Sequence, residues 1–235
     1  MNVTDSNNYR GIALSSVFGK LFDLIFLNKY SDSLYTSKLQ FGFKPRHSTS
    51  MCSMFLKGAL AYYVVDGGSA FCTFLDATKA FDQICKLFRE LLKRDLPRIY
   101  VRLLANLYTN NVAHISWNEI NSKKFVIKMV SDKVVSLALS YIIYIYIYIY
   151  IDGLLRMLRE LNVGCFIGDM FVGALAYADD INLLAPTPSV MRHLLYICEQ
   201  YGRKFSIMFN ANKSAWMYVT NTMLVYLNFS LMASA

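Results

Sequence analysis

Cysteine and histidine are scarce in this sequence, and their spacing argues against a zinc site or a disulfide framework. The 235 residues contain five cysteines and three histidines. No two cysteines have Cys-x-x-Cys spacing, and no histidine lies at ligand spacing from a cysteine. We therefore expect reduced, buried thiols in an intracellular protein of the nucleus or the cytoplasm. The cysteines are Cys52, Cys72, Cys85, Cys165 and Cys198, and the histidines are His47, His114 and His193.

The sequence also lacks a secretion signal and the composition of a disordered chain. Residues 1–8 are polar, whereas a signal peptide contains a continuous apolar segment. Charged residues make up 17% of the chain and hydrophobic residues 55%, so we expect a folded core. The length suffices for one core or for two lobes that share a cleft. Because the sequence begins abruptly, we expect it to be a piece of a longer chain.

Positive charge exceeds negative charge. The chain carries 24 lysines and arginines against 16 aspartates and glutamates, a net charge of +8, and its pI is about 9.2. A basic surface is attracted to the phosphate backbone of nucleic acids and equally to anionic membranes. The charge therefore narrows the class of partner without choosing one.

Several stretches place apolar residues at helical spacing. Ser15 and Ser16 precede one that continues to Ile25, and serine is a favoured helix cap. A basic loop over 39–49 interrupts the pattern, and a second helix is expected to follow it as far as about residue 65. Further helices are expected over 84–92, 97–107, 154–161 and 187–201.

Strands are expected between these helices. Ala70–Leu75 is a short apolar run rich in β-prone residues, and it predicts a buried strand that ends at Asp76. The separation of helices from hairpins, in place of a regular βαβ alternation, predicts an α+β fold. The remaining expected strands are 112–117 with 124–130, 164–168 with 170–177, and 205–209.

Two adjacent carboxylates, Asp179 and Asp180, stand between apolar runs that read as strands. Burying like charges side by side is unfavourable, so a divalent metal ion is a natural partner for them. A solvated hairpin turn that happens to carry two aspartates explains the same residues, because aspartate is common in turns. The pair alone leaves both interpretations open.

The run of alternating tyrosine and isoleucine over 141–151 is of low complexity. Its alternation predicts a strand, although neither face is polar. Residues 134–151 carry no charge and approach the length of a membrane span, but tyrosine favours the membrane interface over its centre. An alternating T-A repeat in DNA also translates as Tyr-Ile, so expansion of a DNA repeat explains the run better than selection for a fold.

The acidic block Tyr177–Asp180, with Phe74–Asp82 upstream, resembles reverse transcriptases of non-LTR (LINE-like) retrotransposons. Residues 8–16, 40–49 and 205–214 resemble three further blocks of that family and occur in the family's order. The resemblance covers residues 8–217. It implies a right-hand polymerase with a fingers-like region over 1–69, an antiparallel palm sheet packed on helices over 70–217, and a divergent tail over 218–235 with the thumb missing.

The resemblance also implies the activity, RNA-directed DNA polymerisation with two Mg²⁺ ions. Asp76 and Asp179 would bind both ions, and Asp180 would complete the acidic cluster. Lys213 matches the lysine that protonates the departing pyrophosphate. Carboxylate oxygens suit this chemistry, because Mg²⁺ prefers hard oxygen ligands. The implied partners are an RNA template, a DNA primer and deoxynucleoside triphosphates.

Four residues are implied to bind the nucleotide. Phe81 matches the bulky residue that excludes a ribose 2′-hydroxyl, although plain core packing would also explain it. Lys44 and Arg46 are candidates for the triphosphate, and arginine in particular suits phosphate oxygens; a solvated loop charge is the alternative for Lys44. Tyr177 leads into the acidic pair.

The departures from the family limit the expected activity. Tyr150–Leu155 matches a family block, but the Gln-Gly block that should precede it is missing, and the Tyr-Ile insert disrupts residues 129–151. We therefore expect a fragment of a decayed element. The alternatives to an active polymerase are a catalytically dead remnant that binds nucleic acid and, less favoured, a protein that associates with membranes through 134–151.

Overall fold

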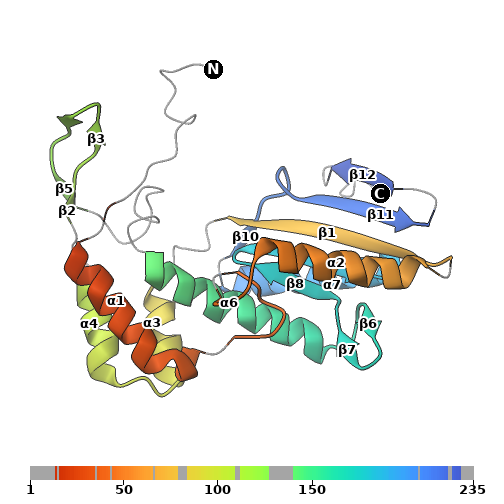
Figure 1. Ribbon diagram of the computed structural model, residues 1–235, viewed down its shortest axis with the longest axis horizontal. Helices are drawn as coiled ribbons and strands as arrows, with labels where there is room; N and C mark the ends of the chain where they lie inside the picture. The colour runs from red at the N-terminus through yellow and green to blue at the C-terminus, as the bar shows by residue number, and fades with distance from the viewer. Residues whose placement is uncertain are drawn as a thin grey trace. The chain divides into compact units, whose positions relative to one another are not determined.

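The computed structural model resolves the chain into two compact units, Met1–Tyr35 with Phe81–Tyr146 and Thr36–Ala80 with Ile147–Ala235 (Figure 1). The residues that the structure describes are 14, 16–34, 36–42, 44–65, 67–78, 84–108, 112–126, 140–205, 207–221 and 224–228. The borders between fingers, palm and tail given above remain a prediction. The structure groups residues 36–69 with the large sheet of the second unit.

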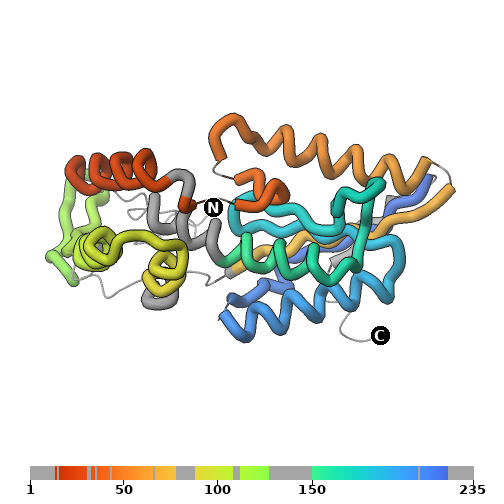
Figure 2. The backbone as a smooth tube through the Cα atoms, turned by 90° about the horizontal axis from the view of Figure 1, so that it is seen from below, coloured from red at the N-terminus to blue at the C-terminus, as the bar shows by residue number. Residues whose placement is uncertain are grey.

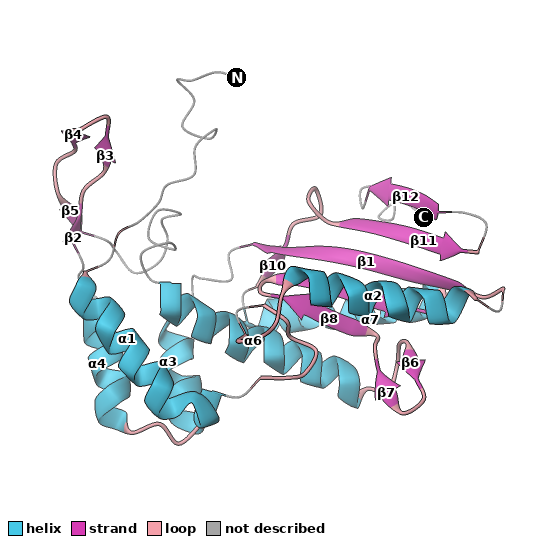
Figure 3. Cartoon of the chain, viewed as in Figure 1, coloured by secondary structure: helices cyan, strands magenta, loops and turns pink. Residues whose placement is uncertain are grey.

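The first unit contains the predicted helices and a small hairpin arm (Figure 3). The hydroxyl of Ser16 caps α1 by accepting a hydrogen bond from the amide of Gly19 (3.1 Å). The arm over 112–126 is divided into two short ladders, and its tip at Asn118-Glu119 has positive φ at both residues. The elements are α1 (Val17–Tyr30), η2 (Ser31–Leu34), α3 (Ile84–Lys93), α4 (Arg98–Tyr108), β2 (Val112–Ala113), β3 (Ser116–Trp117), β4 (Ile120–Asn121) and β5 (Phe125–Val126).

The second unit is built on a six-stranded antiparallel sheet with the order β12-β11-β1-β9-β8, to which β10 adds by pairing with β1. This architecture confirms a mixed fold of helices and antiparallel strands. The strands are β1 (Ser69–Thr78), β8 (Ala174–Tyr177), β9 (Asp180–Ala185), β10 (Met208–Phe209), β11 (Ala215–Thr220) and β12 (Leu224–Asn228), and a separate hairpin joins β6 (Phe166–Ile167) to β7 (Met170–Phe171).

Helices cover both faces of this sheet (Figure 2). On one face, α2 (Thr49–Val64) packs its Ala59 into a buried cluster with Cys72 of β1 and Met217 of β11. On the other, α7 (Pro188–Phe205) accepts a hydrogen bond at the sulfur of Met191 from the hydroxyl of Thr73 (3.2 Å). Because neighbouring residues of a strand point to opposite faces, Cys72 and Thr73 identify the two sides of β1.

The prediction of a strand for the Tyr-Ile run is wrong, because the run opens the helix α6 (Ser140–Glu160). Both residue types of the repeat are apolar, so a period of two separates no buried face from an exposed one. The pattern after the repeat decides the conformation: Ile151, Leu154, Leu155 and Leu158 are fully buried at helical spacing. Within the described residues, no helix is both long and apolar enough to cross a membrane.

One other segment differs from expectation. The expected strand over 205–209 shortens to β10, because Phe205 still belongs to α7 and its ring packs at a tilt against that of Tyr201 (ring centroids 4.4 Å apart). From residue 218, where a divergent tail is expected, the end of β11 and the strand β12 extend the sheet as far as Asn228. A segment without a regular alternation of apolar and polar residues can therefore still form the strands at one edge of a sheet.

Candidate active site

The antiparallel register of β1 and β9 brings two of the predicted carboxylates together. Asp76 and Asp180 are directly paired residues of these neighbouring strands. Both lie on the face of the sheet covered by α2, since they are an even number of residues from Cys72 and its partner Leu184. Two segments about a hundred residues apart in the sequence thus present acidic side chains at one place.

The third carboxylate lies at the tip of the hairpin between β8 and β9. Tyr177 pairs with Asp180, which leaves a two-residue turn of Ala178 and Asp179. Ala178 has φ of 60°, a left-handed conformation that is unfavourable for a residue with a side chain and common for glycine at this place in tight hairpins. The turn that presents Asp179 is therefore strained.

A loop from another part of the second unit supports this turn. Gln40 is fully buried, and its side-chain amide bonds to both the N–H and the carbonyl of Ala178 (3.0 Å each). Sequence reasoning assigned no role to Gln40. Its place in a block shared with the reverse transcriptases was a signal of importance, but nothing in the sequence marks a loop glutamine as buried.

The end of β1 is held by the loop that carries Lys213. Asp76 accepts a hydrogen bond at its carbonyl from the amide of Asn210 (2.9 Å), and its own amide donates to the hydroxyl of Ser214 (3.3 Å). The same hydroxyl donates to the carbonyl of Asn210 (2.8 Å), which closes the loop on itself. The main chain of Asp76 is thus fixed from its neighbours on both sides.

A pocket of about 380 Å³ opens between these strand ends and the first turns of α2. Four of the predicted site residues line it: Asp76, Tyr177, Asp180 and Lys213. Asp179 and Arg46 are outside its lining, as is Lys44. The other residues of the lining are Thr49, Cys52, Ser53, Leu56, Phe74, Leu75, Ile181 and Asn182.

The electrostatics of the carboxylates reflect their crowding. Burial raises the pKa of Asp179 above its ordinary value, and the neighbouring charge of Asp76 raises it further. Burial also raises the pKa of Asp180, with added contributions from Asp179 and Asp76, while the ammonium group of Lys213 lowers it. The site therefore holds more negative charge than Lys213 compensates.

The donor set fits a hard divalent cation. All three side chains offer carboxylate oxygens, the ligands that Mg²⁺ prefers, and Oδ2 of Asp76 is buried without a hydrogen-bond partner. As the side chains lie, no group of three acidic, histidine or cysteine side chains among the described residues is arranged to hold a metal ion. The carboxylates thus match a cation in charge and chemistry but are not closed around one.

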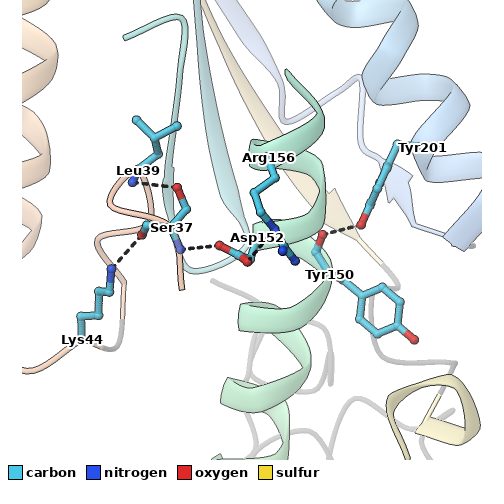
Figure 4. Close-up of polar contacts among 7 residues, drawn as sticks. All are labelled: Ser37, Leu39, Lys44, Tyr150, Asp152, Arg156 and Tyr201. Carbon is cyan, nitrogen blue, oxygen red and sulfur yellow. Dashed lines mark hydrogen bonds and ion pairs between the residues drawn. The ribbon is translucent and has the colours of Figure 1, made fainter. Parts of the chain in front are cut away.

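The predicted nucleotide-binding residues are not gathered in one place. Lys44 donates from Nζ to the carbonyl of Ser37 (2.7 Å), and burial lowers its pKa while the charge of Asp152 raises it (Figure 4). Arg46 is exposed on the loop with φ of 62°, and Tyr177 is half-buried. Phe81 lies outside the described residues. Their binding of a nucleotide remains a prediction.

Asp152 of α6 is a charged residue of the core that sequence reasoning did not assign. It is 1% exposed, its Oδ2 lies 3.2 Å from Nε of Arg156, and its Oδ1 accepts a hydrogen bond from the amide of Ser37 (Figure 4). The contact joins α6 to the start of the loop that contains Gln40. Its place in the block Tyr150–Leu155, which resembles a block of the family, was the available signal, but its partner is 115 residues away.

The comparison with protein families gives one match that spans nearly the whole chain. Residues 3–231 match the family described as reverse transcriptase (RNA-dependent DNA polymerase). The match contains every residue predicted for the site. No curated protein sequence matches the chain.

Among solved structures, the fold is similar to telomerases from two Candida species. Telomerase from Candida tropicalis in complex with a fragment of telomeric RNA gives a TM-score of 0.53 at 10% identity, covering 85% of this chain and 33% of that one. The apo enzyme truncated from its C-terminal domain gives 0.54 at 9%, covering 85% and 40%. Telomerase from Candida albicans with telomeric RNA gives 0.51 at 12%, covering 92% and 36%. The chain thus spans about a third of these telomerases, and the likeness concerns the fold alone.

Proposed function

The chain belongs to the reverse transcriptase family, whose members are RNA-directed DNA polymerases, and we propose that it is the polymerase domain of a non-LTR (LINE-like) retrotransposon. The observation that carries the activity is the pairing of Asp76 with Asp180 beside the Asp179 turn, at a pocket that also contains Lys213. The five sequence blocks in LINE-like order support the retrotransposon origin. The fold itself is shared with telomerases and does not distinguish the two.

The three aspartates would hold the divalent ions of the reaction. When bound, such ions activate the primer hydroxyl and neutralise the charge of the triphosphate. The protein's own contribution is to keep the carboxylates together against their repulsion, which the strand pairing and the two supporting loops do. The same burial that raises the pKa of Asp180 also strengthens the attraction between the ionised Asp180 carboxylate and a cation.

Lys213 would transfer a proton to the departing pyrophosphate. It lies in the same pocket as Asp180 and affects the pKa of that carboxyl, so an ammonium group stands close to where negative charge develops. Tyr177 lines the pocket as well and would contact the nucleotide. Arg46 and Lys44 would attract the triphosphate from the adjoining loop, and an RNA template with a DNA primer would complete the substrates.

Primer extension on an RNA template with Mg²⁺ tests this function. We expect the wild-type chain to extend the primer and Asp179→Asn to lose about a thousandfold or more, because metal ions supply several kcal/mol of transition-state stabilisation. Asp169→Asn, which changes an exposed aspartate in the neighbouring β6–β7 turn, should extend as the wild type does. Equal extension by wild type and Asp179→Asn would exclude the proposed site.

A catalytically dead remnant is the second candidate. The specific observation in its favour is the absence of the family's Gln-Gly block from residues 122–151, where the chain has the Tyr-Ile run instead. That block lets backbone approach the nucleotide and template, which a side chain would prevent. A wild-type chain that binds primer–template without extending it, at any Mg²⁺ concentration, would identify this remnant.

A further inference from the structure

We propose that Gln40 is a positioning residue for the polymerase reaction: its buried side-chain amide holds the turn that presents the Asp179 carboxylate. The inference rests on the proposed function and adds to it a residue outside the pocket. Gln40 lies on the loop before α2, whereas the turn joins β8 to β9. The two segments are 138 residues apart in sequence.

The geometry is that of a clamp with bonds in both directions. Oε1 of Gln40 accepts hydrogen bonds from the amides of Ala178 (3.0 Å) and Gly42 (2.8 Å), and Nε2 donates to the carbonyl of Ala178 (3.0 Å). The main chain adds a short parallel bridge, in which the amide of Phe41 donates to Ala176 (2.8 Å). Both polar atoms of this fully buried side-chain amide thereby have hydrogen-bond partners, as burial requires.

The clamp acts at the place where the hairpin is weakest. Ala178 has no β-ladder partner and adopts a left-handed conformation that alanine normally avoids. Such a conformation persists only where the surrounding structure over-determines it. Asp179 follows directly, and the charges of Asp76 and Asp180 push its carboxylate away from the site. The bonds from Gln40 fix the peptide whose orientation decides where that carboxylate points.

The loop of Gln40 packs so closely against the turn that position 42, two residues after Gln40, must be glycine. A Cβ on Gly42 would lie 2.1 Å from the amide nitrogen of Ala178 and 2.8 Å from its Cα, which are backbone atoms that cannot step aside. The amide of Gly42 is also the second donor to Gln40. Backbone packing and side-chain bonding therefore act on the same turn.

The far end of the loop is anchored too. The amide of Gln40 donates to the carbonyl of Ser37 (3.2 Å), and the hydroxyl of Ser37 accepts from Leu39 (3.2 Å). The amide of Ser37 donates to Asp152 within α6. A chain of contacts thus runs from the buried Asp152 of α6 through Ser37 to Gln40 and the turn.

Steady-state primer extension by Gln40→Met separates a positioning role from a merely structural one. Methionine keeps the length of the side chain and removes its hydrogen bonds. We expect kcat to fall about a hundredfold, the loss that a misplacement of about 1 Å produces, while the KM for the nucleotide and the Kd for primer–template stay within about twofold. Gln200→Met, at an exposed site on α7, is the matched control and should leave all three constants unchanged.

Amide hydrogen exchange of the metal-free protein supplies a readout that needs no activity. We expect the Ala178 amide to exchange faster in Gln40→Met, with the change confined to the β8–β9 hairpin and its loop. If Gln40→Met fails to fold, Gln40→Glu serves instead: it keeps the acceptor oxygen but loses the donor to Ala178, and should lower kcat about tenfold.

These experiments distinguish a failure of the role of Gln40 from a failure of the proposed polymerase function. Equal kcat in Gln40→Met and Gln200→Met, or a loss of thermal stability with unchanged kcat, would overturn the role of Gln40 while the polymerase stands. A wild-type chain that extends no primer would remove the proposed function. In that case unchanged exchange at Ala178 in Gln40→Met overturns the clamp, and faster local exchange supports it.

Discussion

The two strand ends that carry the site's aspartates are built in different ways. Asp76 belongs to a regular strand with partners on both sides, and a loop that folds on itself at Asn210 and Ser214 fixes its main chain. Asp179 stands in a strained turn held by a buried side chain, Gln40. Main-chain pairing holds the strand that carries Asp76, whereas the turn that carries Asp179 depends on the side chain of a single loop residue.

The largest loss of stability should come from filling the space beside the strained turn at Ala178. Gly42→Ala places a Cβ against the backbone of Ala178, so we expect it to lower the free energy of unfolding by about 3 kcal/mol, the upper end for overpacking. Urea unfolding measures this. Gly58→Ala is the matched control, because nothing lies within 4 Å of its added Cβ, and it should stabilise α2 by about 0.5–1 kcal/mol. Equal stabilities of the two variants would show that the loop does not pack on the turn as described.

The next largest loss of stability should come from weakening the contact of Asp152, which anchors the loop that contains Gln40. Asp152→Asn removes the charge that faces Arg156, and we expect a loss of about 2 kcal/mol in the free energy of unfolding. Breaking a fully buried pair costs more, but the Arg156 side chain is 42% exposed and water screens its charge. Glu199→Gln breaks a pair of the same spacing with Arg203, both on the exposed side of α7, where we expect less than about 0.5 kcal/mol. A loss of stability in Glu199→Gln as large as in Asp152→Asn would show that the buried contact of Asp152 stabilises the fold no more than an exposed ion pair does.

The sequence predicts the regular end of the site better than the strained end. Ser48 caps α2 and Thr187 caps α7, both residue types that favour helix starts, and the apolar run before Asp76 forms β1 as predicted. These features depend on neighbours in sequence, so local propensity and periodicity identify them. The family resemblance then relates Asp76 to the acidic turn, and the strand register agrees.

Two of the missed features depend on contacts between distant segments. A glutamine in a loop and an aspartate in a helix have no periodicity that predicts burial, so the bonds of Gln40 to Ala178 and of Asp152 to Ser37 could not be inferred. The helix that begins at Ser140 was missed for a different reason, because an apolar repeat of two residue types mimics the period of a strand. Tertiary packing decides such segments.

A smaller loss of stability is expected at the strand end that carries Asp76. Ser214→Ala removes the hydroxyl that bonds to the amide of Asp76 and to the carbonyl of Asn210, and we expect a loss of about 1 kcal/mol, typical of a hydrogen bond in a partly buried site. The ladder with β9 still holds Asp76, so kcat should fall less than in Gln40→Met. Ser50→Ala, in the exposed first turn of α2, provides the baseline in the same unfolding measurement. A larger loss of kcat in Ser214→Ala than in Gln40→Met would reverse the contrast between the two ends.

The smallest effect is expected in the metal-free protein, from the repulsion among the carboxylates of the site. Burial and the neighbouring carboxylates raise the pKa of Asp180, so the folded state holds its proton more tightly than the unfolded state. The stability that this provides is complete below the ordinary carboxyl pKa of about 4 and is lost as the pH rises through the folded value. Metal-free Asp180→Asn should therefore be slightly more stable than wild type at pH 7, and the difference should vanish towards pH 4 in urea unfolding. Mg²⁺ at ten times its Kd should reverse the order by stabilising the wild type by about 1.4 kcal/mol. A less stable metal-free variant at pH 7 would mean that Lys213 already balances the acidic cluster, and that the site has no unmet demand for a cation.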